Sequence, residues 1–189
     1  MNIEVEIKVK LDSEEIFGEI KKKVSNSGVL IKAIRQVDDY YVPYHRDFFA
    51  HKPHPVEWMR IRTDPDKTVF EYVRSINPKD DGSQDGSEEY ETEIKNVDEF
   101  KKTLELLNFK YVITVDKQRE YWMCGDIEVA LDYIKGLGYF IEAEAKGDFK
   151  DGFEARNACI NFLENLGIKD VEKTYIKKGY PDLVLEIIK

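Results

Sequence analysis

The sequence predicts an α+β protein in which about eight antiparallel strands form a barrel and helices pack outside it. Two observations lead to this prediction. Several runs alternate between charged and apolar residues, which is typical of β-strands with one polar and one apolar face. The order of motif strand, helix and further strands also occurs twice, so about 1–88 and about 89–189 resemble two halves of a single domain, 1–189.

The first half is expected to hold one helix between strands. Residues 2–10 alternate strictly, which predicts a strand. Asp12 is expected to cap the following helix, with Glu15 as the reciprocal partner of a capping box, and Gly28 is expected to end it. Further strands are expected at 29–43, 58–63 and 68–75, with loops at 45–55 and 64–66.

The second half is expected to repeat this order. Residues 77–88 are rich in Asp, Gly and Ser and predict a mobile hairpin loop before a strand at 91–95. Asn96 and Glu99 predict another capping box, opening a helix that runs to about Asn108. The remaining expected elements are strands at 110–123, 127–134 and 139–146, a helix at 151–165, and one or two short helices in 170–189.

Three of the expected strands carry the pattern glutamate-x-glutamate-x-lysine. Because side chains alternate along a strand, each copy places both carboxylates and the lysine on one face. Carboxylates in line repel one another unless a cation lies between them, so the repeated pattern indicates a metal site. The copies are Glu4, Glu6 and Lys8; Glu91, Glu93 and Lys95; and Glu142, Glu144 and Lys146.

Basic side chains share faces of further strands, with apolar residues on the opposite faces. The helices need apolar surface to cover, so we expect the charged faces to line a water-filled lumen. Carboxylates bind hard divalent cations, whereas arginine and lysine bind phosphate oxygens. The pattern therefore predicts a pocket for a complex of a metal ion with a polyphosphate. Its expected basic residues are Lys8, Arg60, Arg62, Arg74, Lys117 and Arg119.

The composition excludes some classes of protein. With 38 acidic and 29 basic residues, the net charge of −9 argues against non-specific nucleic-acid binding. Cys124 and Cys159 have no metal-binding or redox spacing and are expected to be free thiols of a reducing compartment. No apolar stretch approaches the length of a membrane span, and the amino terminus leads into a charged strand instead of a signal sequence. We therefore expect a cytoplasmic protein that neither enters a membrane nor binds nucleic acid.

Five segments together resemble a known family, the CYTH superfamily or triphosphate tunnel metalloenzymes, which includes class IV adenylyl cyclases and thiamine triphosphatases. The resemblance covers nearly the whole chain in the family's order. The segments are Glu4-Val5-Glu6-Ile7-Lys8, Gln36-x-Asp38-x-Tyr40-Tyr41, Met59-Arg60-Ile61-Arg62, Lys117-Gln118-Arg119 and Leu131-Asp132-x-x-x-Gly136-Leu137-Gly138-x-Phe140-x-Glu142-x-Glu144.

The resemblance implies a closed eight-stranded tunnel and assigns roles to its charged residues. Catalytic roles fall to Lys8, Glu6 and Glu142, and a homodimer is expected. Arg74 departs from the family, where lysine is more usual. The implied ligands of Mg²⁺ or Mn²⁺ are Glu4, Glu6, Asp132, Glu142 and Glu144, with Glu91 and Glu93 as possible further acids, and the implied triphosphate-binding residues are Lys8, Arg60, Arg62, Lys117 and Arg119.

Two reactions fit such a pocket, and both are metal-assisted in-line displacements at phosphorus. The complete segment from Gly136 to Glu144 favours an adenylyl cyclase, which converts ATP to cyclic AMP and pyrophosphate. The alternatives are a triphosphatase acting on thiamine triphosphate, inorganic tripolyphosphate or a nucleoside triphosphate, and a non-catalytic triphosphate binder. A cyclase needs a nucleoside pocket, for which the candidates are Tyr40, Tyr41, Phe48 and Phe49, although core packing explains these residues equally well.

Overall fold

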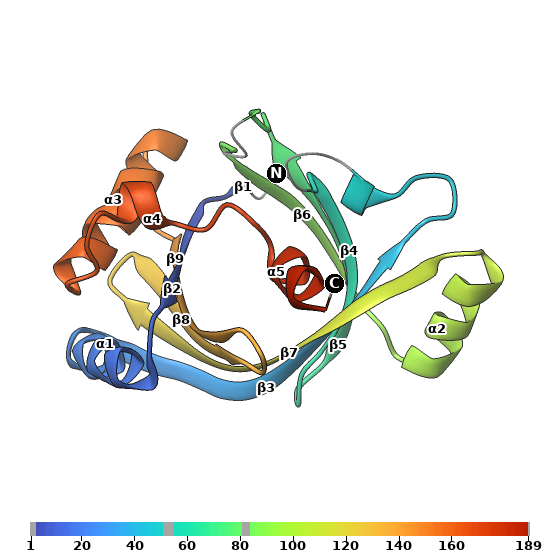
Figure 1. The fold of residues 1–189 in the computed structure, drawn as a ribbon, viewed down its shortest axis with the longest axis horizontal. Coiled ribbons are helices and arrows are strands. Elements are labelled where there is room, and N and C mark those ends of the chain that lie inside the picture. The colour runs from blue at the N-terminus through green and yellow to red at the C-terminus, as the bar shows by residue number, and fades with distance from the viewer. Residues whose placement is uncertain (1–2, 51–54, 81–83, 189) are drawn as a thin grey trace. The chain divides into compact units, whose positions relative to one another are not determined.

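A computed structural model describes residues 3–50, 55–80 and 84–188, which form an α+β fold. Its strands form one sheet in the order β1-β6-β5-β4-β3-β7-β8-β9-β2 (Figure 1), and the strand pairs with a described register are antiparallel. The strands are β1 (Ile3–Glu4), β2 (Glu6–Leu11), β3 (Val29–Val42), β4 (Glu57–Thr63), β5 (Thr68–Ile76), β6 (Gly86–Glu93), β7 (Lys110–Cys124), β8 (Ile127–Ile134) and β9 (Gly138–Ala145). The helices are α1 (Glu14–Ser27), α2 (Val97–Leu106), α3 (Gly152–Asn165), α4 (Val171–Thr174) and α5 (Tyr180–Ile187), with a 3₁₀ turn at Phe48–Ala50.

The chain forms two compact units. The first contains residues 1–3, 35–116 and 178–189, and the second contains residues 4–34 and 117–177. The long strands β3 and β7 each contribute one part to each unit.

In the second unit, α1 and α3 cover the apolar face of the sheet formed by β2, β9 and β8. Ile7 of β2 and Ile141 of β9 are buried there against Val24 of α1 and Leu163 of α3. Figure 1 shows both helices on the same side of β2 and β9. Because strand residues alternate, Glu6 and Lys8 must point to the opposite face.

In the first unit, α2 covers one face of the strands β4 and β5. Met59 and Ile61 of β4 are buried with Leu104 of α2, and Phe70 of β5 packs against the same cluster. The short helix α5 lies on the other side of these strands from α2 (Figure 1). Arg60 alternates with Met59 and Ile61, so it faces away from α2.

The starts of the helices partly match expectation. Helix α1 begins at Glu14, and the side chain of Ser13 accepts a hydrogen bond from the Ile16 amide at 3.2 Å. The predicted cap at Asp12 is therefore wrong by one residue, and so is its pairing with Glu15. The caps at Gly28 and Asn96 are confirmed.

The loop predicted at 77–88 is shorter than expected. Strand β6 begins at Gly86, which lies opposite Ile76 of β5 in the antiparallel ladder. The polar residues from Gly86 onward belong to the sheet because their backbone pairs with β5, and this pairing outweighs their low intrinsic preference for strands. The tail was expected to form one or two short helices, and it forms two, α4 and α5.

Gly28 provides a test of the packing between α1 and β7. A Cβ atom at Gly28 would overlap the Cys124 sulfur and lie 2.9 Å from the Met123 carbonyl oxygen. We expect Gly28→Ala to lower the free energy of unfolding by about 1–3 kcal/mol, the usual cost of overpacking. The matched control is Gly18→Ala, because no atom lies within 4 Å of a Cβ there. Since Gly18 is inside α1, Gly18→Ala should raise the free energy of unfolding by roughly 0.5–1 kcal/mol. Urea denaturation measures both changes.

Candidate functional site

The second unit holds a buried charged cluster on the face away from α1 and α3. Strand pairing places Lys8 of β2 opposite Glu142 of β9, and Arg119 of β7 opposite Asp132 of β8. Lys117 lies two residues before Arg119 and shares its face. All five side chains are buried.

These residues form one network of ion pairs. Arg119 donates hydrogen bonds to both oxygens of Asp132, the Nε to Oδ1 bond being 2.6 Å long, and also to Glu142. Lys8 Nζ lies 3.1 Å from Glu142 Oε1 and 3.8 Å from the carboxylate of Glu6. Glu142 is therefore held between two cations.

The charges in this network stabilise one another. Burial alone would raise the pKa of Glu142, but Arg119, Lys8 and Lys117 outweigh it and hold the pKa well below its usual range. Burial would lower the pKa of Lys8, and Glu142 and Glu6 outweigh this effect and raise it. Three buried cations thus face two buried carboxylates. Buried charges are costly and weak evidence of stability, so their retention favours a functional role.

The first unit holds a second cluster, on the face of β4 and β5 away from α2. The register places Asp38 of β3 opposite Arg62, Tyr40 of β3 opposite Arg60, and Arg60 opposite Glu71 of β5. Asp38 and Glu71 are completely or almost completely buried, at 0% and 1% exposure.

Each arginine in this cluster is clamped by a carboxylate. Arg60 donates to Glu71 from Nε at 2.9 Å and from Nη2 at 2.6 Å, and to the Tyr40 hydroxyl from Nη1 at 3.1 Å. Arg62 donates to Asp38 from Nε at 2.9 Å and from Nη2 at 3.3 Å. A guanidinium has five N–H groups, so these bonds fix each side chain and leave donors for an anion.

Burial would raise the pKa of Glu71, but Arg60 and Arg62 outweigh it and lower the pKa to about 2. The pKa of Arg62 is raised: burial and Arg60 lower it, whereas Asp38 and Glu71 raise it by more. Both arginines and Glu71 therefore carry their charges throughout the physiological range.

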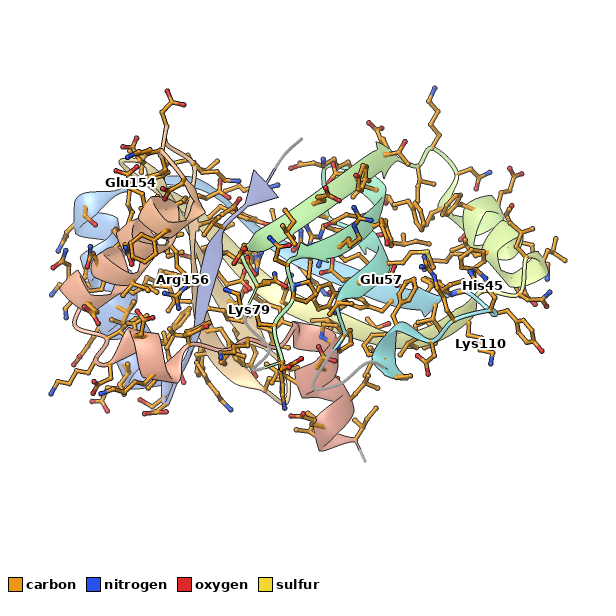
Figure 2. The ribbon with its side chains drawn as sticks, turned by 90° about the horizontal axis from the view of Figure 1, so that it is seen from above. His45, Glu57, Lys79, Lys110, Glu154 and Arg156 are labelled. Carbon is orange, nitrogen blue, oxygen red and sulfur yellow. The ribbon has the colours of Figure 1, made fainter. Side chains whose placement is uncertain are left out.

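The structure does not bring Arg74 to this cluster. Arg74 lies on the face of β5 opposite to Glu71, is 57% exposed at its side chain, and donates to Glu88. Odd and even positions of a strand point to opposite faces, and Arg74 is three residues from Glu71. Glu57, labelled in Figure 2, lies on the Arg74 face and accepts a 2.5 Å hydrogen bond from Tyr72. Arg74 therefore lies apart from the other predicted phosphate-binding residues of this unit.

The further acids Glu91 and Glu93 lie on β6. Glu91 is opposite Glu71 in the register but is exposed, and it pairs with Lys67 at 2.6 Å. Glu93 is opposite Val69 and also exposed. Both residues share the Glu71 face of the sheet but stay outside its buried ion pairs.

The predicted metal ligands are only partly brought together. Within the described residues, no group of three or more acidic, histidine or cysteine side chains is arranged to hold a metal ion. Asp132 and Glu142 are engaged by Arg119, and Glu4 has a side chain outside the description. Glu6 and Glu144 lie opposite each other across β2 and β9, and Glu144 also pairs with Lys146 at 2.5 Å. Since Mg²⁺ usually takes one or two protein carboxylates and fills its shell with water and substrate phosphates, this pair fits such an ion.

The four aromatic candidates for a nucleoside pocket serve the interior of the first unit. Tyr41 and Phe48 are buried in the apolar cluster under α2, and Phe49 packs against it. Tyr40 is buried on the other face, where its hydroxyl accepts from Arg60. The packing interpretation is confirmed for Tyr41, Phe48 and Phe49.

Sequence reasoning missed Asp38 and Glu71 as members of the charged cluster. Glu71 lies within the aromatic and apolar run Phe70–Val73, and an acid at an alternating position in such a strand indicates a buried partner. Asp38 lies two residues before Tyr40, on the same face of the strand, in a segment that supported the family resemblance. Its partner Arg62 becomes evident only from the strand register.

The family of this chain is shown by its similarity to known proteins. The CYTH domain model matches residues 2–180, and the chain belongs to this family. It is 33% identical to "Putative adenylate cyclase MJ0240" of Methanocaldococcus jannaschii over 182 residues, which cover 96% of this chain and 98% of that protein.

Solved structures share the fold. The PH1819 protein from Pyrococcus horikoshii superposes with a TM-score of 0.78 at 28% identity, over 97% of this chain and 99% of that one. HpAC1 from Hippeastrum superposes with a TM-score of 0.59 at 17% identity, over 88% and 89% of the two chains.

No helix among the described residues is long and apolar enough to span a membrane.

The clamp on Arg60 gives a stability prediction. We expect Glu71→Gln to lower the free energy of unfolding at pH 7 by about 3 kcal/mol, because it leaves a buried guanidinium without its charged partner. The folded-state pKa of Glu71, about 2, lies below the ordinary value of 4.5. Its stabilising contribution is therefore complete above about pH 4.5 and is lost as the pH falls toward 2.

Urea denaturation of wild type and Glu71→Gln between pH 7 and pH 2.5 measures this difference. The difference in free energy of unfolding between the two proteins should become steadily smaller below pH 4.5. The control is Glu91→Gln, whose exposed pair with Lys67 should contribute no more than about 0.5 kcal/mol. A wild-type advantage that stayed constant down to pH 2.5 would contradict the clamp.

Proposed function

We propose that the chain is a metal-dependent triphosphatase that hydrolyses a compound carrying a triphosphate group. The observation that carries this proposal is the buried cluster of Lys8, Lys117 and Arg119 around two carboxylates. Cations fixed in this way in a low-dielectric setting suit the oxygens of a phosphate chain. The closed eight-stranded tunnel, the cytoplasmic location and the homodimer expected from the sequence belong to the same proposal.

In each unit the cationic side chains have the proposed role of binding phosphate oxygens. Lys8, Lys117 and Arg119 bind phosphate oxygens in the second unit, and Arg60 and Arg62 do so in the first. Lys8 keeps its proton, since its pKa is raised, and so contributes positive charge throughout the reaction. Glu142 and Asp132 orient Lys8 and Arg119 by ion pairing.

Glu6 and Glu144 would hold Mg²⁺ or Mn²⁺. Such an ion neutralises phosphate charge and lowers the pKa of a bound water. Catalysis by this chain's own groups then rests on positioning the phosphates and on stabilising charge as the P–O bond breaks.

The choice of hydrolysis over cyclisation rests on the aromatic residues. The sequence alone favoured a cyclase, but its four candidate nucleoside contacts pack in the interior or bond Arg60. Hydrolysis needs no base recognition. HpAC1 from Hippeastrum is called a "putative adenylyl cyclase", and the description of its structure says that it has a dominant triphosphatase activity. Its fold is shared with this chain, which supports placing hydrolysis ahead of cyclisation.

Adenylyl cyclase activity is the second candidate. It is supported by the complete segment from Gly136 to Glu144 and by the identity with the M. jannaschii protein. The two candidates differ in the attacking group, which is water in a triphosphatase and the ribose 3′-hydroxyl in a cyclase.

A product assay separates these functions. Purified protein is incubated with Mg²⁺ or Mn²⁺ and with ATP, thiamine triphosphate or inorganic tripolyphosphate. We expect orthophosphate release and no cyclic nucleotide. Cyclic AMP with equimolar pyrophosphate would establish the cyclase instead, and binding of triphosphates without any product would establish a non-catalytic binder.

Substitution of a metal-binding carboxylate tests the site. We expect Glu6→Gln to lower metal-dependent turnover more than about 100-fold, because it removes one of two carboxylates proposed for the ion. The Glu6 side chain is 49% exposed, so the melting temperature should stay within a few degrees of wild type. Arg74→Ala is the matched control and should keep activity within twofold, since Arg74 faces away from the cluster. Full activity of Glu6→Gln with unchanged metal dependence would sink the assignment.

A further inference from the structure

The first unit contains a buried acceptor without a partner. Gln36 is only 2% exposed, and its side-chain oxygen accepts no hydrogen bond from any residue that the structure describes. Leaving a buried acceptor unpaired is destabilising, so such an atom calls for a specific explanation. Neither the predicted site residues nor the proposed roles include Gln36.

Gln36 belongs to the arginine cluster by its place on β3. It is two residues before Asp38 and four before Tyr40, so all three side chains lie on one face of the strand. Asp38 pairs with Arg62, and Tyr40 accepts a hydrogen bond from Arg60. Two residues span roughly 6.6 Å along a strand, which places the Gln36 carboxamide at the next position along this face.

The chemistry of the unpaired atom restricts its ligand. An amide oxygen accepts hydrogen bonds and donates none. The oxygens of an ionised phosphate are also acceptors, so a phosphate chain held by Arg60 and Arg62 cannot satisfy Gln36. The missing partner is therefore an O–H or N–H group, or a cation, since amide oxygens also bind hard divalent ions. The one reactant with such a group that every triphosphate hydrolysis shares, inorganic tripolyphosphate included, is the attacking water.

We propose that Gln36 orients the attacking water by accepting a hydrogen bond from it, a role that rests on the proposed triphosphatase function. The water oxygen forms a new bond to the terminal phosphorus. The bridging P–O bond breaks, and its electron pair leaves on the remaining phosphates. One water proton stays on the orthophosphate and the other passes to the leaving group. Gln36 exchanges no proton and acts by fixing the direction of attack.

Three variants test this role. Gln36→Met removes the acceptor and keeps a similar volume, Gln36→Glu retains an acceptor oxygen, and Gln118→Met is the control. Gln118 lies on β7 and is exposed, on the face opposite to Lys117 and Arg119. For each variant, kcat and KM are measured with inorganic tripolyphosphate and with ATP, and the melting temperature is recorded.

We expect kcat of Gln36→Met to fall about 100-fold on both substrates, with KM within threefold of wild type. Its melting temperature should be equal or higher, because the substitution removes a buried unpaired acceptor. Gln36→Glu should recover at least about tenfold of the lost kcat, and Gln118→Met should behave like wild type. Recovery in Gln36→Glu decides the question even if the Met variant folds poorly.

Other outcomes overturn the role of Gln36. Wild-type kcat in Gln36→Met would show that the acceptor is not used. A loss confined to ATP would show that Gln36 recognises the nucleoside, because tripolyphosphate carries no N–H group. A lower melting temperature in both variants, without recovery in Gln36→Glu, would assign Gln36 a structural role. Absence of phosphate release by the wild type would overturn the triphosphatase proposal itself, and Gln36's role with it.

Discussion

The fold depends on pairing each buried guanidinium with a carboxylate on a neighbouring strand. Both faces of these strands are covered or partly buried, so the charged side chains cannot rely on water for their stability. Arg60 is held by Glu71, and Arg119 by Asp132. Removing any one partner would leave an uncompensated charge in a low-dielectric setting, which is far more costly than the pair is stabilising. The arrangement therefore fixes the strand register as well as the site.

Helix placement follows from the same constraint. The charged face of each strand cannot pack against an apolar helix, so α1 and α3 in the second unit and α2 in the first all cover the opposite faces. The apolar residues between the charged ones, such as Ile7 and Ile61, form the two cores. A one-residue shift of register would exchange the two faces, burying charges under the helices.

The sequence predicted these faces well because strand alternation is a local property. It placed Lys8, Arg60 and Arg119 correctly on the charged faces. It could not decide Arg74, because an ion pair on the outer face of β5 gives the same sequence pattern as one on the inner face. Asp38 and Glu71 were missed because their partners lie on other strands, and only the register reveals them. Gln36 was missed because an unpaired buried oxygen leaves no sequence signal at all.

The two clusters balance their charges in different ways. In the second unit, Lys8, Lys117 and Arg119 are buried with the carboxylates of Asp132 and Glu142, and the exposed Glu6 lies 3.8 Å from Lys8. In the first unit, Arg60 and Arg62 are balanced by Asp38 and Glu71, so the cluster offers oriented N–H groups with no surplus charge. Oriented donors without net charge contribute little to long-range attraction but discriminate sharply by geometry. For the proposed function, donors of this kind in the first unit would fix the direction in which a phosphoryl group is held, which is what a directed attack requires.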